Sequence, residues 1–292
     1  MRHPDCIDPG MARLMLLLMV LACGCSRHAT FPEDRPMSSG AAPEPTDPAL
    51  RDGLPRGASR HGGVSTYSSL PALFSGQVGS RLLLRELPDG EPLVGVGSLS
   101  DLRGEIAIVD GEVCVSYPDA SAAQRASDER AAFLAVARVD TWHERTLTRS
   151  IDWQALPAEL AERGRAAGFS EQEPMAIRVD GRAEDIEYNI VNGPALGIGR
   201  DTPRPLAKEE LSRTASKHSL ASARVSITGF YARENAEAFI HSGESLHLHV
   251  LLPDTEQMGH LDHVTLPQGL VVKLGRPVPE REQATASVAQ PL

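Results

Sequence analysis

The sequence predicts an α+β fold of mixed β-sheets with few helices. Glycine (25) and proline (22) are plentiful among the 292 residues, as is typical of strand-and-turn proteins rather than helical bundles. Asp110-Gly111 joins two short apolar runs, which is a strong hairpin signal. Residues 153–167 carry the clearest helical spacing, and Gly168 follows them as a stop. A chain of this size can bury one large core or two small ones.

The other elements are predicted from short apolar or alternating runs along the chain. The sequence predicts a strand and a short helix over 64–74, a short element at 81–85, and strands at 93–98, 105–109, 112–115, 131–139, 175–179, 186–191, 224–231, 246–252, 258–261 and 269–274. Alanine richness leaves a helix open at 131–139. Asp180-Gly181 indicates a turn, and the polar stretch 200–218 predicts a loop with a helical turn at 208–211.

The first 25 residues resemble a bacterial signal peptide that ends in a lipobox. Residues 14–22 form an apolar run that is too short to span a bilayer. Cys23 is the first candidate for lipidation and Cys25 the alternative, and translation starts at Met1 or Met11. A plain secretory signal with incidental cysteines is the competing interpretation. We therefore expect a bacterial cell-envelope protein that is lipid-anchored or secreted.

Composition divides the rest of the chain into a tether, a folded domain and a tail. Residues 26–61 are rich in proline, serine, glycine and charge, which predicts a flexible tether. The domain is expected over 62–276, with a sheet part over 62–195 and a second sheet part over 220–276. Residues 277–292 are expected to form a loose tail.

Charge and cysteine content exclude several classes of protein. The formal net charge is −10 and no dense Lys/Arg patch is present, which argues against nucleic acid as a partner. Three of the four cysteines lie within the first 25 residues, so Cys114 is the single thiol in the body of the chain. A disulfide framework is thereby excluded for the folded domain.

The segment 246–252 contains the strongest candidates for metal-ligating residues in the sequence. Its alternation places His247 and His249 on one face of a strand, and a return strand would bring His260 beside them. Three neutral imidazoles with an open position are typical of a catalytic divalent metal site, most often zinc. The competing interpretation is a polar strand face whose histidines meet solvent. His143, His218 and His241 lie outside this pattern and are interpreted as solvated.

The order of motifs resembles the α-acetolactate decarboxylase family. The similarity lies in five stretches: VSTYSSLPALFSG (64–76), VGVGSLSDLRGEIAIVDGEV (94–113), AAFLAVARV (131–139), EPMAIRVDG (173–181), and ITGFY with SLHLHVLLPDTEQMGHLDH (227–231 and 245–263). Each stretch alone is weak, but five in the right order that end in three histidines make a specific signal.

The resemblance implies a two-layer architecture and a metal held by His247, His249 and His260. It places the family's catalytic glutamate on Glu105 and a hydroxyl residue on Ser98. It also implies conversion of 2-acetolactate, or a similar 2-hydroxy-3-keto acid, to acetoin. In that chemistry the metal is a Lewis acid that stabilises an enediolate after carbon dioxide leaves, and no organic cofactor is needed.

Two departures from the family pattern keep a second interpretation open. Asn189 stands where the family has an arginine, and an asparagine supplies no fixed positive charge. A family glutamate beyond the third histidine has no matching motif here. The alternative is a noncatalytic or changed-function metal-binding envelope lipoprotein on the same fold. A cupin-like site is disfavoured, because no glutamate follows His249 at the expected distance. The oligomeric state is left open, and a homodimer is compatible with the resemblance.

Overall fold

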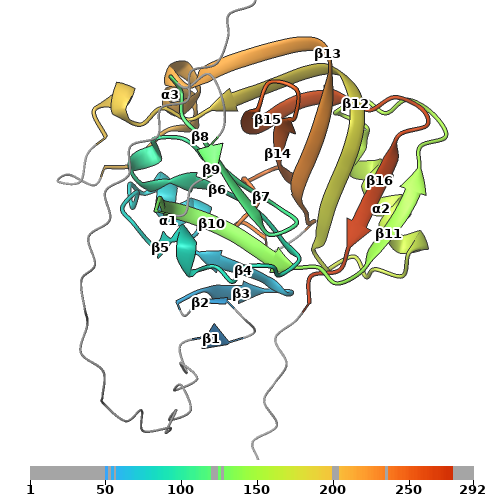
Figure 1. Ribbon diagram of the computed structural model, residues 1–292, viewed down its shortest axis with the longest axis horizontal. Coiled ribbons are helices and arrows are strands. Elements are labelled where there is room, and N and C mark those ends of the chain that lie inside the picture. Colours follow the sequence, from blue (N-terminus) through green and yellow to red (C-terminus); the bar gives the residue numbers. More distant parts are fainter. Residues whose placement is uncertain are drawn as a thin grey trace, which may run out of the picture. The chain divides into compact units, whose positions relative to one another are not determined.

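The computed structural model describes residues 57–278 with gaps at 120–123, 126–127, 199–203 and 234–235, together with residues 50–51 and 54–55. In this part the chain forms an eight-stranded sheet, a six-stranded sheet and a two-stranded pair (Figure 1). The predicted fold class, mostly strand with few helices, is confirmed. The predicted signal peptide and lipobox, the tether up to residue 49 and the tail from residue 279 lie outside the described residues.

The eight-stranded sheet, called the first sheet below, is built from the N-terminal half of the domain. Its strands run in the order β3-β4-β10-β6-β7-β8-β9, and β5 pairs with β10. Their bounds are β3 (Ser59–His61), β4 (Val64–Tyr67), β5 (Leu82–Leu83), β6 (Leu93–Leu99), β7 (Glu105–Val109), β8 (Glu112–Ser116), β9 (Gln124–Arg125) and β10 (Arg130–Arg138). Asp110 and Gly111, with φ of 51° and 81°, form the predicted turn between β7 and β8. The alanine-rich segment at β10 is a strand, not a helix, and is buried on both faces.

The six-stranded sheet, called the second sheet, follows in the order β11-β16-β12-β13-β14-β15, and β12 also pairs with β15. Its strands are β11 (Trp142–Thr146), β12 (Met175–Ile190), β13 (Ser216–Tyr231), β14 (Leu246–Leu252), β15 (Gln257–Thr265) and β16 (Val271–Gly275). Where the sequence predicts mixed sheets, all pairings of the described strands are antiparallel. Short connections such as those after β7 and β14 can return the chain only in the antiparallel sense.

The helices are short and lie between or beside the strands. They are α1 (Leu70–Phe74), α2 (Leu156–Ala166) and α3 (Lys208–Thr214), with single 3-10 turns at Leu84–Glu86, Ser100–Leu102 and Pro194–Leu196. The helix predicted over 153–167 is therefore present as α2. Within the described residues, no helix combines the length and the apolar character that crossing a bilayer requires.

Three features differ from the sequence-based expectation. The turn predicted at Asp180-Gly181 is absent, because β12 continues through it and Gly181 pairs with Val225 of β13. With β11 and β12 in the second sheet, the division between sheets lies near residue 140 rather than between residues 195 and 220. At the tether's end, residues 59–61 form β3 and Leu54 is buried against the first sheet.

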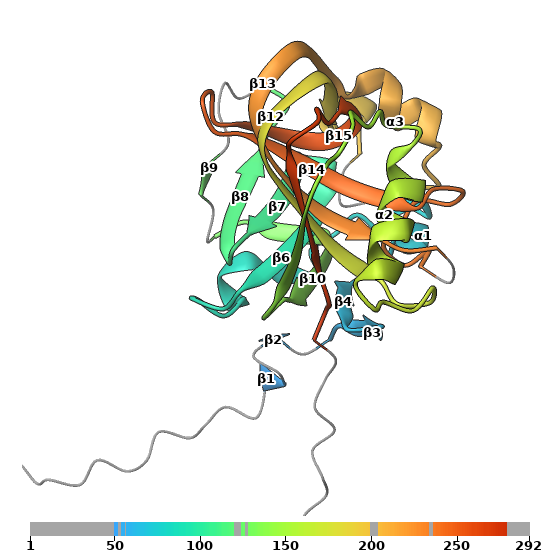
Figure 2. The ribbon, with the colours of Figure 1, turned by 90° about the vertical axis from the view of Figure 1, so that its right-hand side faces the viewer.

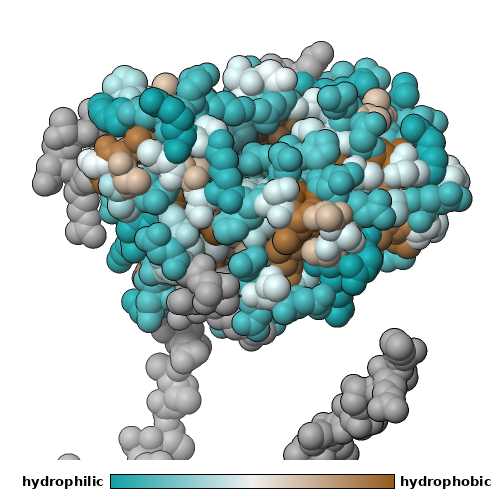
Figure 3. Space-filling model, turned by 90° about the horizontal axis from the view of Figure 1, so that it is seen from above, coloured by the Kyte–Doolittle hydropathy of each residue, from teal (hydrophilic) through white to brown (hydrophobic). Residues whose placement is uncertain are grey.

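Three hydrophobic clusters account for the layering, which Figure 2 shows from the side. One cluster joins α2 to the outer face of the second sheet, through residues such as Leu156, Leu160 and Leu248. A second lies between the sheets and includes Phe133 of β10 and Phe230 of β13. The third covers the other face of the first sheet. On the face seen in Figure 3, hydrophilic residues dominate and hydrophobic ones appear in separate patches.

Candidate metal centre and active site

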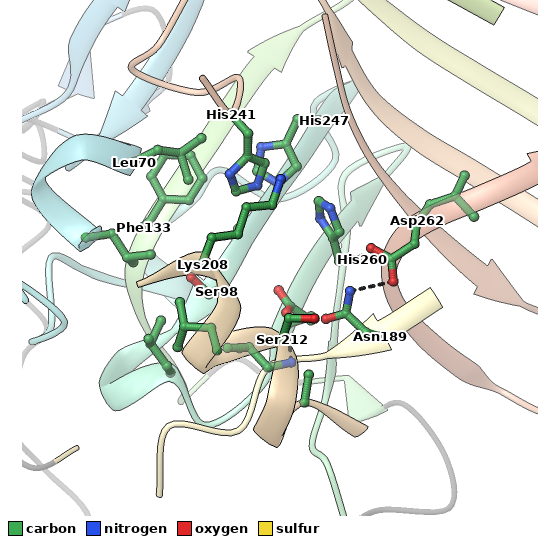
Figure 4. Close-up of a pocket in the computed structure, with 18 of the residues that line it drawn as sticks. Leu70, Ser98, Phe133, Asn189, Lys208, Ser212, His241, His247, His260 and Asp262 are labelled. Carbon is green, nitrogen blue, oxygen red and sulfur yellow. Dashed lines mark hydrogen bonds between the residues drawn. The ribbon is translucent and has the colours of Figure 1, made fainter. Parts of the chain in front are cut away.

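A cavity of about 210 Å³ lies where the two sheets meet α1 and α3. Figure 4 shows the imidazoles of His241, His247 and His260 grouped on its wall, with Lys208 of α3 reaching toward them. The polar residues that line it are Ser98, Glu105, Asn189, Lys208, Ser212, His241, Glu244, His247, His260 and Asp262. Drug-sized ligands occupy sites of roughly 300–1,000 Å³, so this cavity suits a smaller molecule.

Alternation along β14 aims two histidines into the space between the sheets. Leu246, Leu248 and Val250 point to the opposite face, where they belong to the cluster under α2. His247 stacks on Phe133 of the first sheet, with ring centroids 5.9 Å apart and planes nearly parallel at 3°. The strand is thus fixed on one face by apolar packing, and its imidazoles face the first sheet.

The strand register brings the third predicted histidine to the first two. In the β14–β15 pairing, His249 lies directly opposite His260. The ring centroids are 5.4 Å apart for His247 and His249, 5.2 Å for His247 and His260, and 5.5 Å for His249 and His260. The structure therefore places the three sequence-predicted metal ligands in one cluster.

A fourth imidazole, that of His241, lies in the same cluster. Its ring centroid is 5.0 Å from that of His247 and 5.4 Å from that of His260. The candidate ligand atoms of His241, His247 and His260 all lie within 4.8 Å of one another. The interpretation of His241 as solvated is therefore wrong. Phe239 and Ile240, both buried, bring the loop into the core, and this apolar pair is the sequence signal that was overlooked.

Burial keeps these imidazoles neutral. Loss of hydration lowers the pKa of His241, His247 and His260 to about 3, and nearby imidazoles add to the shift. The pKa of His249 is also lowered well below its usual value, again mainly by burial. A neutral imidazole keeps a nitrogen lone pair, which is the form that binds metals.

The donor set fits a divalent transition metal. The Nδ1–H of His247 donates to the Phe239 carbonyl at 2.7 Å, which leaves Nε2 as the acceptor nitrogen. The Nδ1 of His241 and the Nε2 of His249 are buried without a hydrogen-bond partner. Buried polar atoms of this kind call for an explanation such as an ion. Several imidazoles beside a carboxyl group suit zinc and similar metals better than magnesium or calcium.

Glu105 is the carboxyl group next to the imidazoles, and it belongs to the first sheet. Its Oε1 accepts a hydrogen bond from the Val191 amide at 3.0 Å, and its Oε2 lies 3.9 Å from His249 Nε2. Burial, aided by the negative charge of Asp262, raises the pKa of Glu105 to about 8 against the opposing effect of the Val191 hydrogen bond. Without a metal, this carboxyl group is therefore mostly protonated at neutral pH.

Ser98 and Asn189 also reach the cavity, each through strand register. Ser98 of β6 lies opposite Glu105 in the β6–β7 pairing, and its side chain is buried. Asn189 of β12 lies opposite His260, and its amide donates to Asp262 Oδ2 at 2.7 Å. Lys208 of α3 brings an ammonium group to the rim, where it pairs with Glu244. The predicted residues Ser98, Glu105 and Asn189 are thus gathered at one cavity with His247 and His260.

Comparisons with known proteins identify the fold and the family of this chain. Among solved structures, the chain is similar to alpha-acetolactate decarboxylase from Bacillus subtilis strain 168, with 20% identity over 73% of this chain and 85% of that one and a TM-score of 0.59. A Staphylococcus aureus protein of unknown function, described as similar to alpha-acetolactate decarboxylase, matches with 15% identity over 74% of this chain and 85% of that one, at a TM-score of 0.58. At these identities the likeness shows the fold alone. A search of curated proteins found no match. The family model described as "Alpha-acetolactate decarboxylase" matches residues 64–276, and the chain belongs to that family.

Proposed function

We propose that this protein is a metal-dependent carboxy-lyase that converts 2-acetolactate, or a similar 2-hydroxy-3-keto acid, to acetoin or its analogue. The observation that carries the proposal is the meeting of His241, His247, His260, Glu105 and Ser98 at one small cavity in a chain of this family, with His249 beside Glu105. The ligand set supports a divalent metal, with zinc as the first candidate. When bound, such a metal supplies Lewis acidity toward neighbouring hydroxyl and carbonyl oxygens.

Glu105 is suited to the proton transfer that decarboxylation requires. Breaking the carbon–carbon bond releases carbon dioxide and leaves the electron pair on the former substrate, which must then take up a proton at carbon. In the metal-free chain, the raised pKa of Glu105 keeps a proton on its carboxyl group near neutral pH. Its Oε1 is fixed by the Val191 amide, so Oε2 is the oxygen available to deliver that proton.

Ser98 and Lys208 are suited to holding the substrate. The buried hydroxyl of Ser98 can donate a hydrogen bond to a substrate oxygen beside Glu105. Among the described residues that line the cavity, Lys208 is the one lysine or arginine. A substrate carboxylate would compete with Glu244 for its ammonium group, which partly offsets the charge absent at Asn189.

The test is acetoin formation from 2-acetolactate by the full chain, prepared metal-free and then supplied with zinc. Acetoin should appear only with metal and should be lost in His249→Ala. His143→Ala is the matched control, because this histidine lies on β11 and packs against Phe169. Turnover that is equal with and without metal would contradict the proposal.

A second candidate is a metal-binding protein of the same fold without this turnover. The observation that favours it is Asn189, whose amide is engaged by Asp262 and carries no charge for a carboxylate. Tight metal binding without acetoin formation, in the assay above, would select this alternative.

We also propose that the domain is anchored to the cell envelope through a lipid on Cys23 or Cys25. The support is the sequence alone, namely the apolar run and the small residues before these cysteines. In a bacterial host, Cys23→Ser should move the protein from the membrane fraction to the soluble fraction. If Cys25→Ser alone does so, Cys25 is the anchor. Membrane association that survives the double substitution would contradict the proposal.

A further inference from the structure

We propose that His241 is a ligand of the metal at this centre, so that the loop between β13 and β14 contributes to a site otherwise built on strands. This inference rests on the metal site of the proposed function, but not on decarboxylation. It concerns a residue that lies outside the strand pattern of the other three histidines.

The first support is the direction in which the imidazoles face. His241, His247 and His260 line the cavity and converge with candidate ligand atoms within 4.8 Å of one another. His249 is fully buried and lies beside Glu105, outside the set of residues that line the cavity. Two triads therefore share His247 and His260, one completed by the strand residue His249 and one by the loop residue His241. Figure 4 shows His241 beside His247 on the cavity wall.

The second support is the environment of the His241 ring. Its Nδ1 is buried and has no hydrogen-bond partner. The ring packs edge-on against Phe74 of α1, with centroids 5.9 Å apart, which holds it on the side of the cluster. A buried imidazole nitrogen without a partner costs free energy unless something binds it. A metal shared with His247 and His260 supplies that partner.

The third support is the anchoring of the loop. Phe239 and Ile240 are buried in the cluster between the sheets. The Leu70 amide donates to the Ala238 carbonyl at 3.0 Å, and His247 Nδ1–H donates to the Phe239 carbonyl at 2.7 Å. His241 thus follows directly after a segment tied both to α1 and to a predicted metal ligand. These contacts restrain the backbone directly before His241 and so support the position of its ring.

The chemistry points to a metal of the zinc, cobalt, nickel and copper group. Four imidazoles form a nitrogen-rich set, which these metals prefer, whereas magnesium and calcium prefer oxygen ligands. Cobalt(II) is the useful probe, because it accepts zinc-like geometry and its visible absorption reports the number and type of its ligands.

The test is a Co²⁺ titration of the metal-free full chain followed by its visible absorption spectrum. His241→Ala should weaken Co²⁺ binding by about 10- to 100-fold or more. It should also change the positions and intensities of the visible absorption bands. His143→Ala, a histidine outside the cavity, should match the parent in both. An unchanged affinity and spectrum in His241→Ala would overturn the inference, and so would a parent chain that binds no Co²⁺.

A second variant guards against misfolding as the cause of lost binding. His241→Gln keeps a polar side chain of similar size, and its fold is checked by circular dichroism. In the proton NMR spectrum of the Co²⁺-loaded chain, each bound imidazole with a ring N–H gives one strongly shifted exchangeable signal. We expect one such signal fewer in folded His241→Gln than in the parent, and equal numbers would overturn the inference.

The outcomes separate this inference from the proposed function. Acetoin formation with an unchanged Co²⁺ spectrum in His241→Ala would leave the decarboxylase proposal intact and remove His241 from the ligand set. A changed spectrum and weaker Co²⁺ binding without acetoin formation would support His241 as a ligand and remove the decarboxylase proposal.

Discussion

Burial shifts the pKa values of the two kinds of titratable side chain in this site in opposite directions. It disfavours the charged form of each, so the pKa values of the histidines fall while the pKa of Glu105 rises. At neutral pH the metal-free site therefore holds uncharged imidazoles beside a protonated carboxyl group. This combination offers lone pairs for a metal and a proton for carbon at neighbouring positions.

The lowered histidine pKa values predict loss of stability in acid for the metal-free chain. Unfolded histidines take up protons below about pH 6.5, whereas folded His241, His247 and His260 do so only near pH 3. The free energy of unfolding should therefore fall as pH drops below 6.5, by up to about 1.4 kcal/mol per pH unit for each such histidine. Glu105 acts in the opposite sense, since its contribution is lost as pH rises from about 4.5 to about 8.

Urea unfolding of the chelator-treated chain at pH 7 and pH 5 checks this expectation. The four histidines with lowered pKa values outweigh one carboxyl group, so the chain should be less stable at pH 5. Equal unfolding free energies at the two pH values would show that these imidazoles are not held neutral.

Glu105→Gln tests the proposed proton donor. The amide keeps the shape and can still accept from the Val191 amide, but it has no proton of suitable acidity to deliver. We expect kcat to fall about 10²- to 10⁴-fold while Co²⁺ still binds. Glu162→Gln on the exposed face of α2 is the control and should retain full activity. A variant at residue 105 with unchanged kcat would exclude Glu105 as the acid.

At the scale of elements, strand register assembles the site. Pairing sets His249 opposite His260, Asn189 opposite His260, and Ser98 opposite Glu105. Each of these pairs comes from neighbouring strands of one sheet, so backbone hydrogen bonds fix their spacing. The side chains then need little further support to converge.

Gly259→Ala should disturb this register next to His260. A Cβ at this position would lie 2.5 Å from the Asn189 carbonyl oxygen, a backbone atom that cannot move without shifting β12. We expect the free energy of unfolding to fall by about 1–3 kcal/mol. Co²⁺ binding should weaken as well, because His260 moves with the strand. Chemical denaturation and the Co²⁺ titration measure the two effects.

Gly79→Ala is the matched control for this substitution. A Cβ there would meet no atom within 4 Å, so neither stability nor Co²⁺ binding should change appreciably. If the variants at residues 79 and 259 behave alike, the close approach of β12 and β15 is not what fixes His260.

Sequence patterns predict the elements whose formation depends on residues close together in the chain. Alternation identified β14, and Asp110-Gly111 identified the β7–β8 hairpin, because both signals lie within a few residues. The continuity of β12 through Gly181 was missed, since its pairing with Val225 is a tertiary event that overrides a local turn signal. The sequence does not identify His241 as part of the site for a related reason. The position of His241 depends on the burial of Phe239 in the cluster between the two sheets, which is a tertiary contact.

At the scale of the whole domain, the site spans the two sheets. Glu105 and Ser98 come from the first sheet, and the histidines lie on the second sheet or in the loop that leads to β14. Thr228 adds a hydrogen bond to the Ile108 carbonyl across the same space, at 3.3 Å. The acid and the metal ligands are therefore neighbours only while the sheets stay packed together.

Metal binding should consequently stabilise the whole domain. An ion that binds the folded chain alone raises the free energy of unfolding by about 4 kcal/mol at a thousand times its Kd. We expect the thermal midpoint of the full chain to rise with added zinc and to fall again with chelator. His247→Ala should abolish most of the rise, while His143→Ala should keep it. A midpoint that does not respond to zinc would contradict a metal site in this cluster.

The register of β14 also limits which insertions and deletions this family fold can accept. Removing one residue within Leu246–Leu252 would exchange the two faces of the strand and point leucines, not imidazoles, toward Glu105. One residue added in the turn after Leu252 leaves the faces of β14 unchanged, but it can shift the register of β15 and with it His260. The connection before β14 lies outside this hairpin, and His241 is part of it. Length changes during the divergence of such chains should therefore collect before β14, where a new side chain can reach the centre without changing the β14–β15 register.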